Sequence, residues 1–486
     1  MSEAAKYIEN QPLSAVGSGK DRERGLVSQI FRSGGLLTGS RIASKFLALA
    51  TMSVLAHQLS EHDMGIAMSL LAGVALVEML GEIGFDQRLL QLDEAEATNQ
   101  LPSVQSVLLL RGLGASALLC LVAYPLGVAF GFGEDRLAFF AVAAVPLVRS
   151  ARNVQIVIRQ RRLDFRAYAL AEIIPEIAAI AAIFPIVRMF EGYQAVVAIT
   201  YLRAALVILV SHVLAATPYR LGWNATAVSG LLNYGWPLTI NGLLIYGSIQ
   251  GDRLIVASTF DMASMAGYSL AATYAFLPSL AVNSLLQRLF LPLLVGQEDP
   301  ERFNQRYRVI RSVCTAAALS FFALFLLIGP AGVEFLMSDK YEGVYPLTLI
   351  IALAAGVRTL RGSLVIPLLA NGQTRIVLWG SLARCTGLIL AVGFAIWLHD
   401  LLWIAAAALL GELLAAVVSI VVIRRSSIMH CTILSELLPF VASAALLAAA
   451  HYFFDRHLPF PLVSGALFAG IVFVLARRSF VELKRA

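Results

Sequence analysis

Apolar segments of about 20 residues or more recur along the chain, which is what a membrane-spanning helix requires. They run from residue 34 to residue 476, with no intervening stretch long enough for a water-soluble domain. Hydrophobic residues make up 59% of the sequence and charged residues 14%, against about 45–50% and 25% in soluble domains. A helix crosses the bilayer because it makes its backbone hydrogen bonds internally. The chain is therefore predicted to be an all-α polytopic membrane protein.

About fourteen transmembrane helices account for these segments. The predicted spans are 34–58, 64–90, 103–131, 137–158, 168–187, 193–214, 235–258, 266–292, 309–329, 344–370, 376–398, 401–423, 434–453 and 459–476. The predicted organisation is an N-terminal tail (1–33), a first lobe of helices 1–6 (34–214), a linker (215–234), a second lobe of helices 7–12 (235–423), helices 13–14 (424–476) and a C-terminal tail (477–486).

The basic residues support this count and give an orientation, because Lys and Arg are retained in cytoplasmic loops. With a cytoplasmic N-terminus, 22 basic residues fall inside and four fall outside, namely Arg136, Arg188, Lys340 and Arg456. Both termini and the linker are therefore expected in the cytoplasm. The polar N-terminal tail lacks the apolar core of a signal peptide. Because basic residues lie mostly in short loops between apolar runs, nucleic acid is not expected as a partner.

Two short motifs indicate that the lobes are repeats. Span four contains Val148–Arg152 and span ten contains Val357–Arg361, and both read V-R-x-x-R. Span two opens with Gly65–Ala67 and span eight with Gly267–Ser269. Each pair is separated by six spans. A duplicated six-helix unit is therefore predicted, as in many transporters that move two repeats about a central site.

Charged residues inside the spans are the main functional candidates, because a charge at membrane depth is costly unless a partner or a wet cavity receives it. The spans hold eleven cations and seven anions, so a net positive cavity is expected. Guanidinium groups suit two-point binding of phosphate or carboxylate. The candidate substrate-binding residues are Arg41, Lys45, Arg149, Arg203, Arg358, Arg361 and Arg384.

A second candidate is acidic. Glu78, Glu82 and Asp86 follow one another at four-residue steps, which places them on one face of span two. In one interpretation, Glu82 and Asp86 pair with Arg41 and Lys45 and hold the first two spans together. In the other, the acidic face carries a coupling ion, H⁺ or Na⁺.

Other charges have simpler explanations. Arg88, Arg111, Arg152 and Arg288 lie near the cytoplasmic boundary, where long side chains reach the headgroups. Asp252 and Arg253 are adjacent near the outer end of span seven and are interpreted as a pair at the bilayer edge. Neither a G-x-x-x-x-G-K-[ST] phosphate loop nor an H-E-x-x-H metal motif is present, and the outer loops are short. A transporter without a cofactor is therefore expected, rather than an enzyme.

Several stretches resemble the polysaccharide flippases of the Wzx type, which belong to the multidrug/oligosaccharidyl-lipid/polysaccharide exporter superfamily. The resemblance extends from about Gly34 to Arg425. The sequences that carry it are Leu55–Leu59, Met64–Ala67, Ile83–Gln91, Arg161–Arg166, Tyr234–Leu238, Asp252–Leu254, Ala266–Leu270 and Arg288–Pro292.

The resemblance implies two six-helix lobes around a central cavity, alternating access, and a lipid-facing groove formed by spans thirteen and fourteen. It implies as substrate an undecaprenyl-pyrophosphate-linked oligosaccharide that crosses the bacterial inner membrane, for exopolysaccharide, capsule or lipopolysaccharide O-antigen synthesis. Membrane lipids, a polysaccharide polymerase and a chain-length regulator are the candidate partners.

Three alternatives remain open at this point. An ion-coupled multidrug antiporter of the same superfamily predicts twelve spans and a more acidic cavity. A membrane polymerase or acyltransferase predicts a long outer loop or clustered His and Asp residues. The third is a scaffold subunit that transports nothing itself. This alternative does not explain why charged residues lie within the spans.

Overall fold

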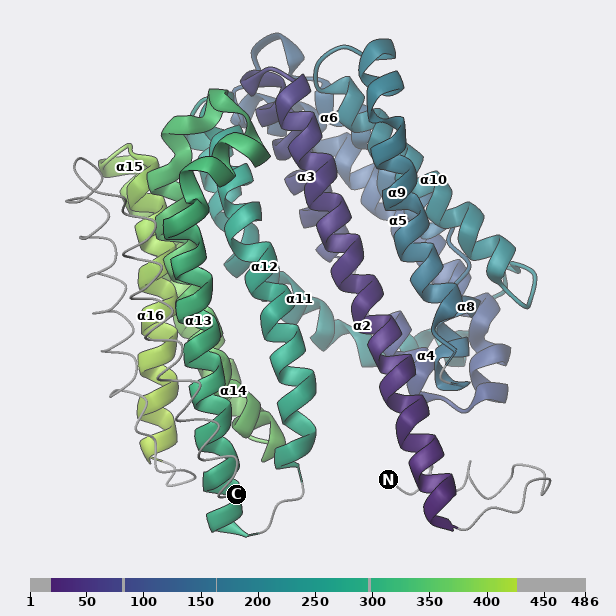
Figure 1. The fold of residues 1–486 in the computed structure, drawn as a ribbon. Coiled ribbons are helices and arrows are strands. Elements are labelled where there is room, and N and C mark those ends of the chain that lie inside the picture. The colour runs from purple at the N-terminus through teal and green to yellow at the C-terminus, as the bar shows by residue number, and fades with distance from the viewer. Residues whose placement is uncertain (1–18, 81–83, 163, 296–298, 426–486) are drawn as a thin grey trace.

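The computed structural model describes residues 19–80, 84–162, 164–295 and 299–425 (Figure 1). Every regular element in these ranges is an α- or 3₁₀-helix, which confirms the all-α prediction there. Nine of their helices are long and apolar enough to cross a membrane, or ten if the bent segment 138–161 counts as one span. The chain is therefore a multi-pass membrane protein. The predicted spans 434–453 and 459–476 lie outside the described residues.

The first lobe occupies the right half of Figure 1. Its helices are α2 (Gly19–Gln58), α3 (Glu61–Leu80), α4 (Phe85–Gln91), α5 (Glu94–Ala129), α6 (Ala138–Val142), α7 (Val145–Ser150), α8 (Gln155–Ile158), α9 (Arg166–Met189) and α10 (Gln194–Leu214). Short 3₁₀ turns, η1 (Gly133–Asp135) and η2 (Arg159–Arg162), flank α6 and α8.

The second lobe contains α11 (Ala225–Thr259), α12 (Met262–Leu294), α13 (Pro300–Met337), α14 (Tyr345–Ala370), α15 (Thr374–Trp397) and α16 (Leu401–Arg425), with η3 (Asp339–Val344) before α14. Side-chain caps begin three of these helices. Asn224 accepts from the N–H groups of residues 226 and 227, Asp261 from that of Ser264, and Asp299 from that of residue 301. Hydrogen bonds from Ser264 also hold the pKa of Asp261 below its usual value.

The two lobes repeat the same packing, in agreement with the predicted six-helix repeat. In the first lobe α2 packs against α9, α9 against α10, and α5 against α7. In the second, α11 packs against α15, α15 against α16, and α13 against α14. Helices α2 and α11 open the two lobes and are not among the nine apolar spans, because their sequences are too polar. The first helix of each lobe is thus unsuited to a lipid-facing position.

Helix α11 also joins the lobes. Its first turns place Val228 and Leu231 in a hydrophobic cluster with α4 and α5 of the first lobe, and its later turns pack against α12 and α15. The helix begins at Ala225, within the predicted linker 215–234. The preceding residues are bound to α5, because the N–H groups of Gly222 and Asn224 donate to Ser106 Oγ and Ser103 Oγ over 3.0 and 3.1 Å.

Two predicted spans are interrupted. Span two consists of α3, which ends at Leu80, and α4, which begins after Gly84 in the left-handed conformation (φ 64°). Span four is bent by 51° between residues 138–150 and 155–161. At the bend, Asn153 Oδ1 accepts from the N–H of Gln155, and Ser211 Oγ of the neighbouring helix α10 accepts from the N–H of Asn153. These side-chain oxygens take the place of the backbone carbonyls that would accept from the same N–H groups in a continuous helix.

Asn153 is the centre of this buried network, and Asn153→Ala is expected to destabilise the protein by about 1–3 kcal/mol. The Asn153 side chain also accepts from Gln105 Nε2 (3.1 Å) and donates to the Thr217 carbonyl (3.2 Å), so its loss leaves buried polar groups without partners. The midpoint of thermal unfolding of the purified protein measures the effect. Asn233→Ala, at an exposed position of α11, is the control and should change little; equal midpoints for both variants would contradict the prediction.

The largest hydrophobic core shared by the two lobes lies at one end, here called the joined end, at the top of Figure 1. There Gly65 of α3 lies against the carbonyl of Met262, so closely that a Cβ atom would be 1.9 Å from the oxygen. Lys340 Nζ of η3 donates to the Leu59 carbonyl at the end of α2 over 3.1 Å. Backbone contact and a cation at a helix C-terminus therefore hold this end together.

At the opposite, separated end, α2 and α12 diverge (Figure 1). The buried apolar residues form distinct clusters there. One combines α4, α5, Val154, Ile158 and the start of α11, and the other combines α12, α13, α14, α15 and α16. The described structure is therefore a two-lobed bundle whose halves pack together at one end and, apart from the start of α11, have separate cores at the other.

Candidate functional site

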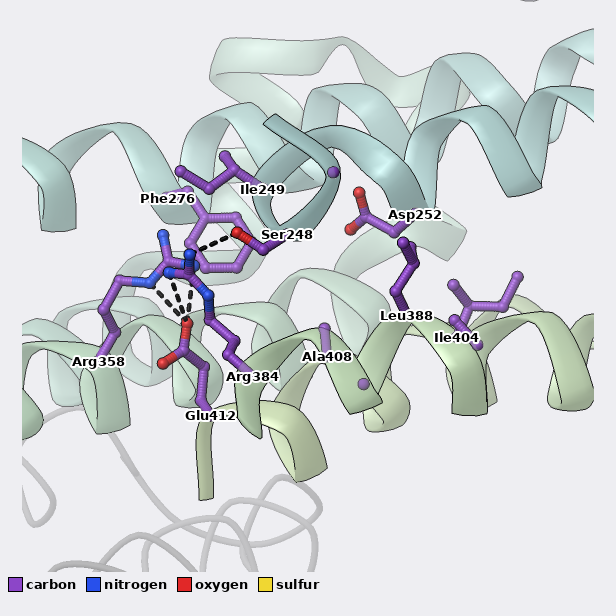
Figure 2. A pocket seen from close by; sticks show the side chains of 13 residues that line it. Ser248, Ile249, Asp252, Phe276, Arg358, Arg384, Leu388, Ile404, Ala408 and Glu412 are labelled. Atoms are coloured by element: carbon purple, nitrogen blue, oxygen red, sulfur yellow. Dashed lines mark hydrogen bonds and ion pairs between the residues drawn. The ribbon is translucent and has the colours of Figure 1, made fainter. Parts of the chain in front are cut away.

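Four charged side chains meet inside the second lobe and form what we call the arginine cluster: Arg358 and Arg361 of α14, Arg384 of α15 and Glu412 of α16 (Figure 2). Arg358 contacts Glu412 Oε1 through both Nε and Nη2, each at 2.7 Å. Arg361 Nε lies 3.5 Å from Oε2, and Arg384 Nη1 lies 3.8 Å from Oε1. The Glu412 carboxylate is thus the counter-charge of all three arginines.

Close helix packing brings these residues together. Arg358 and Arg361 are three residues apart on α14, so they lie on the same face. Helices α15 and α16 approach through glycines, because a Cβ atom on Gly411 would lie 2.8 Å from the Arg384 carbonyl and 3.0 Å from Gly387 Cα. Small residues permit such contacts between membrane helices. The contact places Arg384 within reach of the carboxylate of α16.

The arginine cluster is buried and has more positive than negative charge. The side chains of Arg358, Arg361 and Arg384 are 7%, 8% and 11% exposed, and that of Glu412 is 2% exposed. Arg358 Nη1, Arg384 Nε and Glu412 Oε2 have no hydrogen-bond partner among the described residues. Because buried charged groups are normally both paired and hydrogen-bonded, the unsatisfied N–H groups indicate a place for an anion.

The arginine cluster forms one side of a pocket (Figure 2). Phe276 of α12 lies under the Arg358 guanidinium, 4.7 Å from ring centroid to Cζ, and Ser248 of α11 accepts a hydrogen bond from Arg384. The rest of the wall is mostly small or aliphatic. The lining residues are Gly247, Ser248, Ile249, Asp252, Phe276, Arg358, Arg384, Gly387, Leu388, Ala391, Ile404, Ala408 and Glu412.

Asp252 lines this pocket away from the arginines (Figure 2). Its Oδ2 accepts a hydrogen bond from the buried Tyr268 hydroxyl over 2.7 Å, and no cation of the described chain lies within 4.0 Å of it as an ion pair. Arg253 Nη2 instead donates to Thr273 Oγ1 of α12 over 3.0 Å. The side chains of Asp252 and Arg253 thus each bind a residue of α12 and form no direct ion pair with each other in the described structure.

The predicted acidic face of span two is divided between two helices. Glu78 of α3 pairs with Arg149 of α7, with Nη1 and Oε2 2.9 Å apart. Asp86 of α4 pairs with Arg152, whose Nη2 lies 2.9 and 3.1 Å from the two carboxylate oxygens. Arg152 therefore lies in an ion pair rather than among headgroups. Glu82 lies outside the described residues.

Among the described residues, the ion pair of Arg41 is with α9 rather than with Asp86. Arg41 Nε lies 3.8 Å from Glu172 Oε1 of α9, and its Nη2 donates to Tyr168 Oη over 3.3 Å. The reason is that α2 packs against α9 rather than along α3. Lys45, one turn later on α2, is exposed.

Arg203 of α10 pairs with Glu176 of α9, with Nη2 and Oε2 2.8 Å apart. Of the predicted substrate-binding residues, Arg358, Arg361 and Arg384 share one carboxylate, whereas Arg41, Arg149 and Arg203 each form an ion pair with a different carboxylate of the first lobe. In the described ranges no three His, Cys, Asp or Glu side chains are arranged to hold a metal ion.

Glu412 received no role in the sequence analysis, although a signal was present. The α16 segment Leu401–Arg424 has the highest mean hydropathy of the candidate spans, 2.5, and Glu412 is its only acidic residue. A lone carboxylate in so apolar a helix predicts a cationic partner. Ser248 was missed and Asp252 was interpreted only with its neighbour Arg253, because α11 mixes polar and apolar residues and no single polar residue stands out in it.

Comparisons with known proteins agree with the fold and the resemblance. Solved structures with the same fold include the lipid II flippase MurJ in an inward closed conformation, with a TM-score of 0.70 at 13% identity, covering 92% of this chain and 99% of that one. An inward-facing multidrug resistance transporter of the MATE family and MOP superfamily gives a TM-score of 0.61 at 13% identity, covering 79% and 94%.

Two relatives share the sequence over most of their length. The succinoglycan biosynthesis transport protein ExoT of Rhizobium meliloti (strain 1021) is 22% identical over 72% of this chain and 70% of its own. The lipopolysaccharide biosynthesis protein WzxC of Escherichia coli (strain K12) is 20% identical over 68% of each chain. A family described as polysaccharide biosynthesis protein matches residues 54–346. Because that match covers more than half of the sequence, the predicted resemblance is confirmed and the chain belongs to this polysaccharide biosynthesis protein family.

Proposed function

We propose that this protein translocates an undecaprenyl-pyrophosphate-linked oligosaccharide repeat unit across the bacterial inner membrane. The substrate would be supplied on the cytoplasmic side and consumed by a polymerase on the other side. The observation that carries the proposal is the arginine cluster, in which three buried guanidiniums share one carboxylate. Excess positive charge buried within a membrane is energetically unfavourable unless an anion binds beside it.

The arrangement of the lobes supports alternating access as the mechanism. The joined end is held by contacts of Gly65 and Lys340, whereas the cores of the two lobes are separate at the other end. The positive-inside distribution places the start of α2, and hence the separated end, toward the cytoplasm. In this proposal the described conformation is the one that receives substrate from inside. Coupling of the reverse movement to H⁺ or Na⁺ remains part of the proposal.

An ion-coupled drug antiporter is the second candidate, because MATE transporters have the same fold. A cationic drug needs an unpaired carboxylate in the transport path. In the described first lobe, the carboxylates of Glu78, Asp86, Glu172 and Glu176 all lie within 4.0 Å of an arginine nitrogen. Asp252 of the second lobe has no such ion pair, but it lines a pocket that Arg358 and Arg384 also line. The net positive charge of the arginine cluster also disfavours a cation. We therefore favour the anionic substrate.

Deletion of the gene tests the function directly. We expect surface polysaccharide to be lost and lipid-linked repeat units to accumulate on the cytoplasmic leaflet. The wild-type gene should restore both, whereas Arg384→Gln should restore about a tenth of the polymer or less, because one of the cations that receive the substrate is lost. Quantification of polymer and of extracted lipid intermediates measures the outcome.

The matched control is Arg302→Gln, which removes the same charge from an exposed residue that pairs within its own helix turn with Asp299. It should restore polymer fully. Unchanged polymer and lipid intermediates in the deletion strain, in a host without a second copy of the gene, would refute the flippase proposal and favour the export of another solute.

A further inference from the structure

We propose that Asp252 is a second ion-pair partner of Arg384, and that Arg384 exchanges Glu412 for Asp252 when the two lobes move relative to each other. The inference rests on the alternating access of the proposed function. It makes Asp252 a positioning residue, because its carboxylate acts on the arginine cluster by drawing Arg384 out of it.

The charges that line the pocket balance in number but not in pairing. The charged lining residues are Arg358, Arg384, Glu412 and Asp252. Glu412 forms ion pairs with both arginines, whereas Asp252 has no ion pair within the described chain. Asp252 Oδ2 accepts a hydrogen bond from the Tyr268 hydroxyl instead. Because a carboxylate at membrane depth is costly without a cation, a conformation that gives Asp252 one of the two arginines relieves this cost.

Arg384 is the arginine of the pocket that is held least firmly by Glu412. Its Nη1 lies 3.8 Å from Glu412 Oε1, whereas Arg358 contacts the same oxygen through two nitrogens at 2.7 Å. Arg384 Nε has no hydrogen-bond partner among the described residues. When Arg384 leaves, Arg358 and Arg361 still neutralise Glu412. The exchange therefore gives each carboxylate at least one cation.

Asp252 is within reach of Arg384 along one face of α11. The Arg384 guanidinium donates to Ser248 Oγ, and all three side chains line the same pocket (Figure 2). Ser248 and Asp252 are four residues apart, so they lie on one face of the helix about 6 Å apart along its axis. Gly247 and Gly387 also line the pocket and have no side chains that obstruct the guanidinium. Rotation of the long Arg384 side chain therefore brings the two charges together.

Movement of the lobes drives this rotation, because α11 is attached to both of them. The Tyr246 hydroxyl donates to a backbone carbonyl of α3 in the first lobe, whereas the Arg253 guanidinium donates to α12 in the second. Ser248 lies near the first attachment and Asp252 beside the second. When α3 moves away from α12, Ser248 is drawn away from Arg384 while Asp252 stays in the second lobe, and Arg384 turns to Asp252.

The test measures how often the joined end opens in the full-length protein in lipid nanodiscs. The four native cysteines are replaced by alanine, and Met262 is replaced by cysteine. Met262 is buried at the joined end, with its sulfur 3.9 Å from Ser69 Oγ of α3. A water-soluble maleimide labels residue 262 only while α3 and α12 are apart, so the labelling rate follows the population of the conformation with an open joined end.

Asp252→Asn should lower the labelling rate about tenfold or more, because the open conformation loses its ion pair and the described one loses a carboxylate without a cation. Arg384→Gln should lower the rate to a similar extent, since the same pair is lost. The double variant should label no more slowly than the slower single variant, because both changes remove one interaction. Asp252→Glu keeps the charge and should label as the wild type does.

Tyr268→Phe separates the exchange from a merely structural role of Asp252. The Tyr268 hydroxyl competes with Arg384 for Asp252, so its removal should raise the labelling rate about threefold or more without changing a charge. If Asp252 only bonded α11 to α12, Tyr268→Phe and Asp252→Asn would act in the same direction. Glu301→Gln, which removes an exposed carboxylate from the start of α13, is the control and should label as the wild type does.

Unchanged labelling of Asp252→Asn or Arg384→Gln, additive effects in the double variant, or slower labelling of Tyr268→Phe would each overturn the inference. The labelling test and the deletion test fail independently. The expected labelling rates with normal polymer in the deletion strain would refute the flippase function but keep the exchange. Loss of polymer with accumulated lipid intermediates, together with additive labelling effects, would keep the flippase and refute the exchange.

Discussion

Glu412→Ala is expected to destabilise the protein by about 3–5 kcal/mol, because breaking a buried ion pair leaves its partners uncompensated. Glu412 is the counter-charge of three buried arginines, and its side chain is only 2% exposed. The midpoint of thermal unfolding and the yield of monodisperse protein after detergent extraction measure the loss.

Glu301→Ala is the matched control. Glu301 lies in the first turn of α13 and is exposed, so its replacement should stay within about 0.5 kcal/mol of the wild type. Glu412→Gln, which keeps the shape and the oxygen acceptor, should fall between the two. A Glu412→Ala protein with the wild-type midpoint would mean that the carboxylate does not neutralise the arginine cluster.

Gly65→Leu is expected to disrupt the joined end and to abolish most transport. A side chain at this position has no room, because the neighbouring atom is the backbone oxygen of Met262, which cannot turn away as a flexible side chain would. Overpacking costs about 1–3 kcal/mol even where neighbours relax, which corresponds to a shift of about fivefold to 150-fold in the population of the joined conformation. Polymer production by a complemented deletion strain measures the loss of transport.

Cross-linking of cysteines placed at residues 59 and 340 by a short bifunctional thiol reagent measures the joined end itself, because the long Lys340 side chain contacts the Leu59 carbonyl there. Cross-linking should fall in the Gly65→Leu background. Gly114→Leu is the control, since Gly114 of α5 has open space around its Cα. Undiminished cross-linking and transport in Gly65→Leu would show that the contact does not hold the lobes together.

For the charged residues within the predicted spans, the sequence shows which residues are candidates but not which residues they pair with. A lone arginine in an apolar run is visible in the sequence, so Arg358, Arg361 and Arg384 were identified as candidates. Their partner was not, because Glu412 is separated from Arg358 by two helix connections. The ion pair of Arg41 with Glu172 of α9 was not predicted for a related reason: α2 packs mainly along α9 rather than along α3, its neighbour in the sequence.

The sequence by itself determined the membrane class, the two six-helix lobes and the family. These properties depend on hydropathy summed over whole segments, on motifs repeated at a fixed offset, and on local stretches that resemble known flippases. None of them requires knowledge of which helices touch.

The tertiary structure alone decided which charges meet. Whether an arginine finds a carboxylate depends on which helices are neighbours and on how closely their backbones approach, as at Gly387 and Gly411 between α15 and α16. It also decided where spans two and four break, because Asn153 can replace a helical hydrogen bond only when Ser211 and Gln105 are brought beside it. Contacts over tens to hundreds of residues have no local sequence signal, so only the folded chain reveals them.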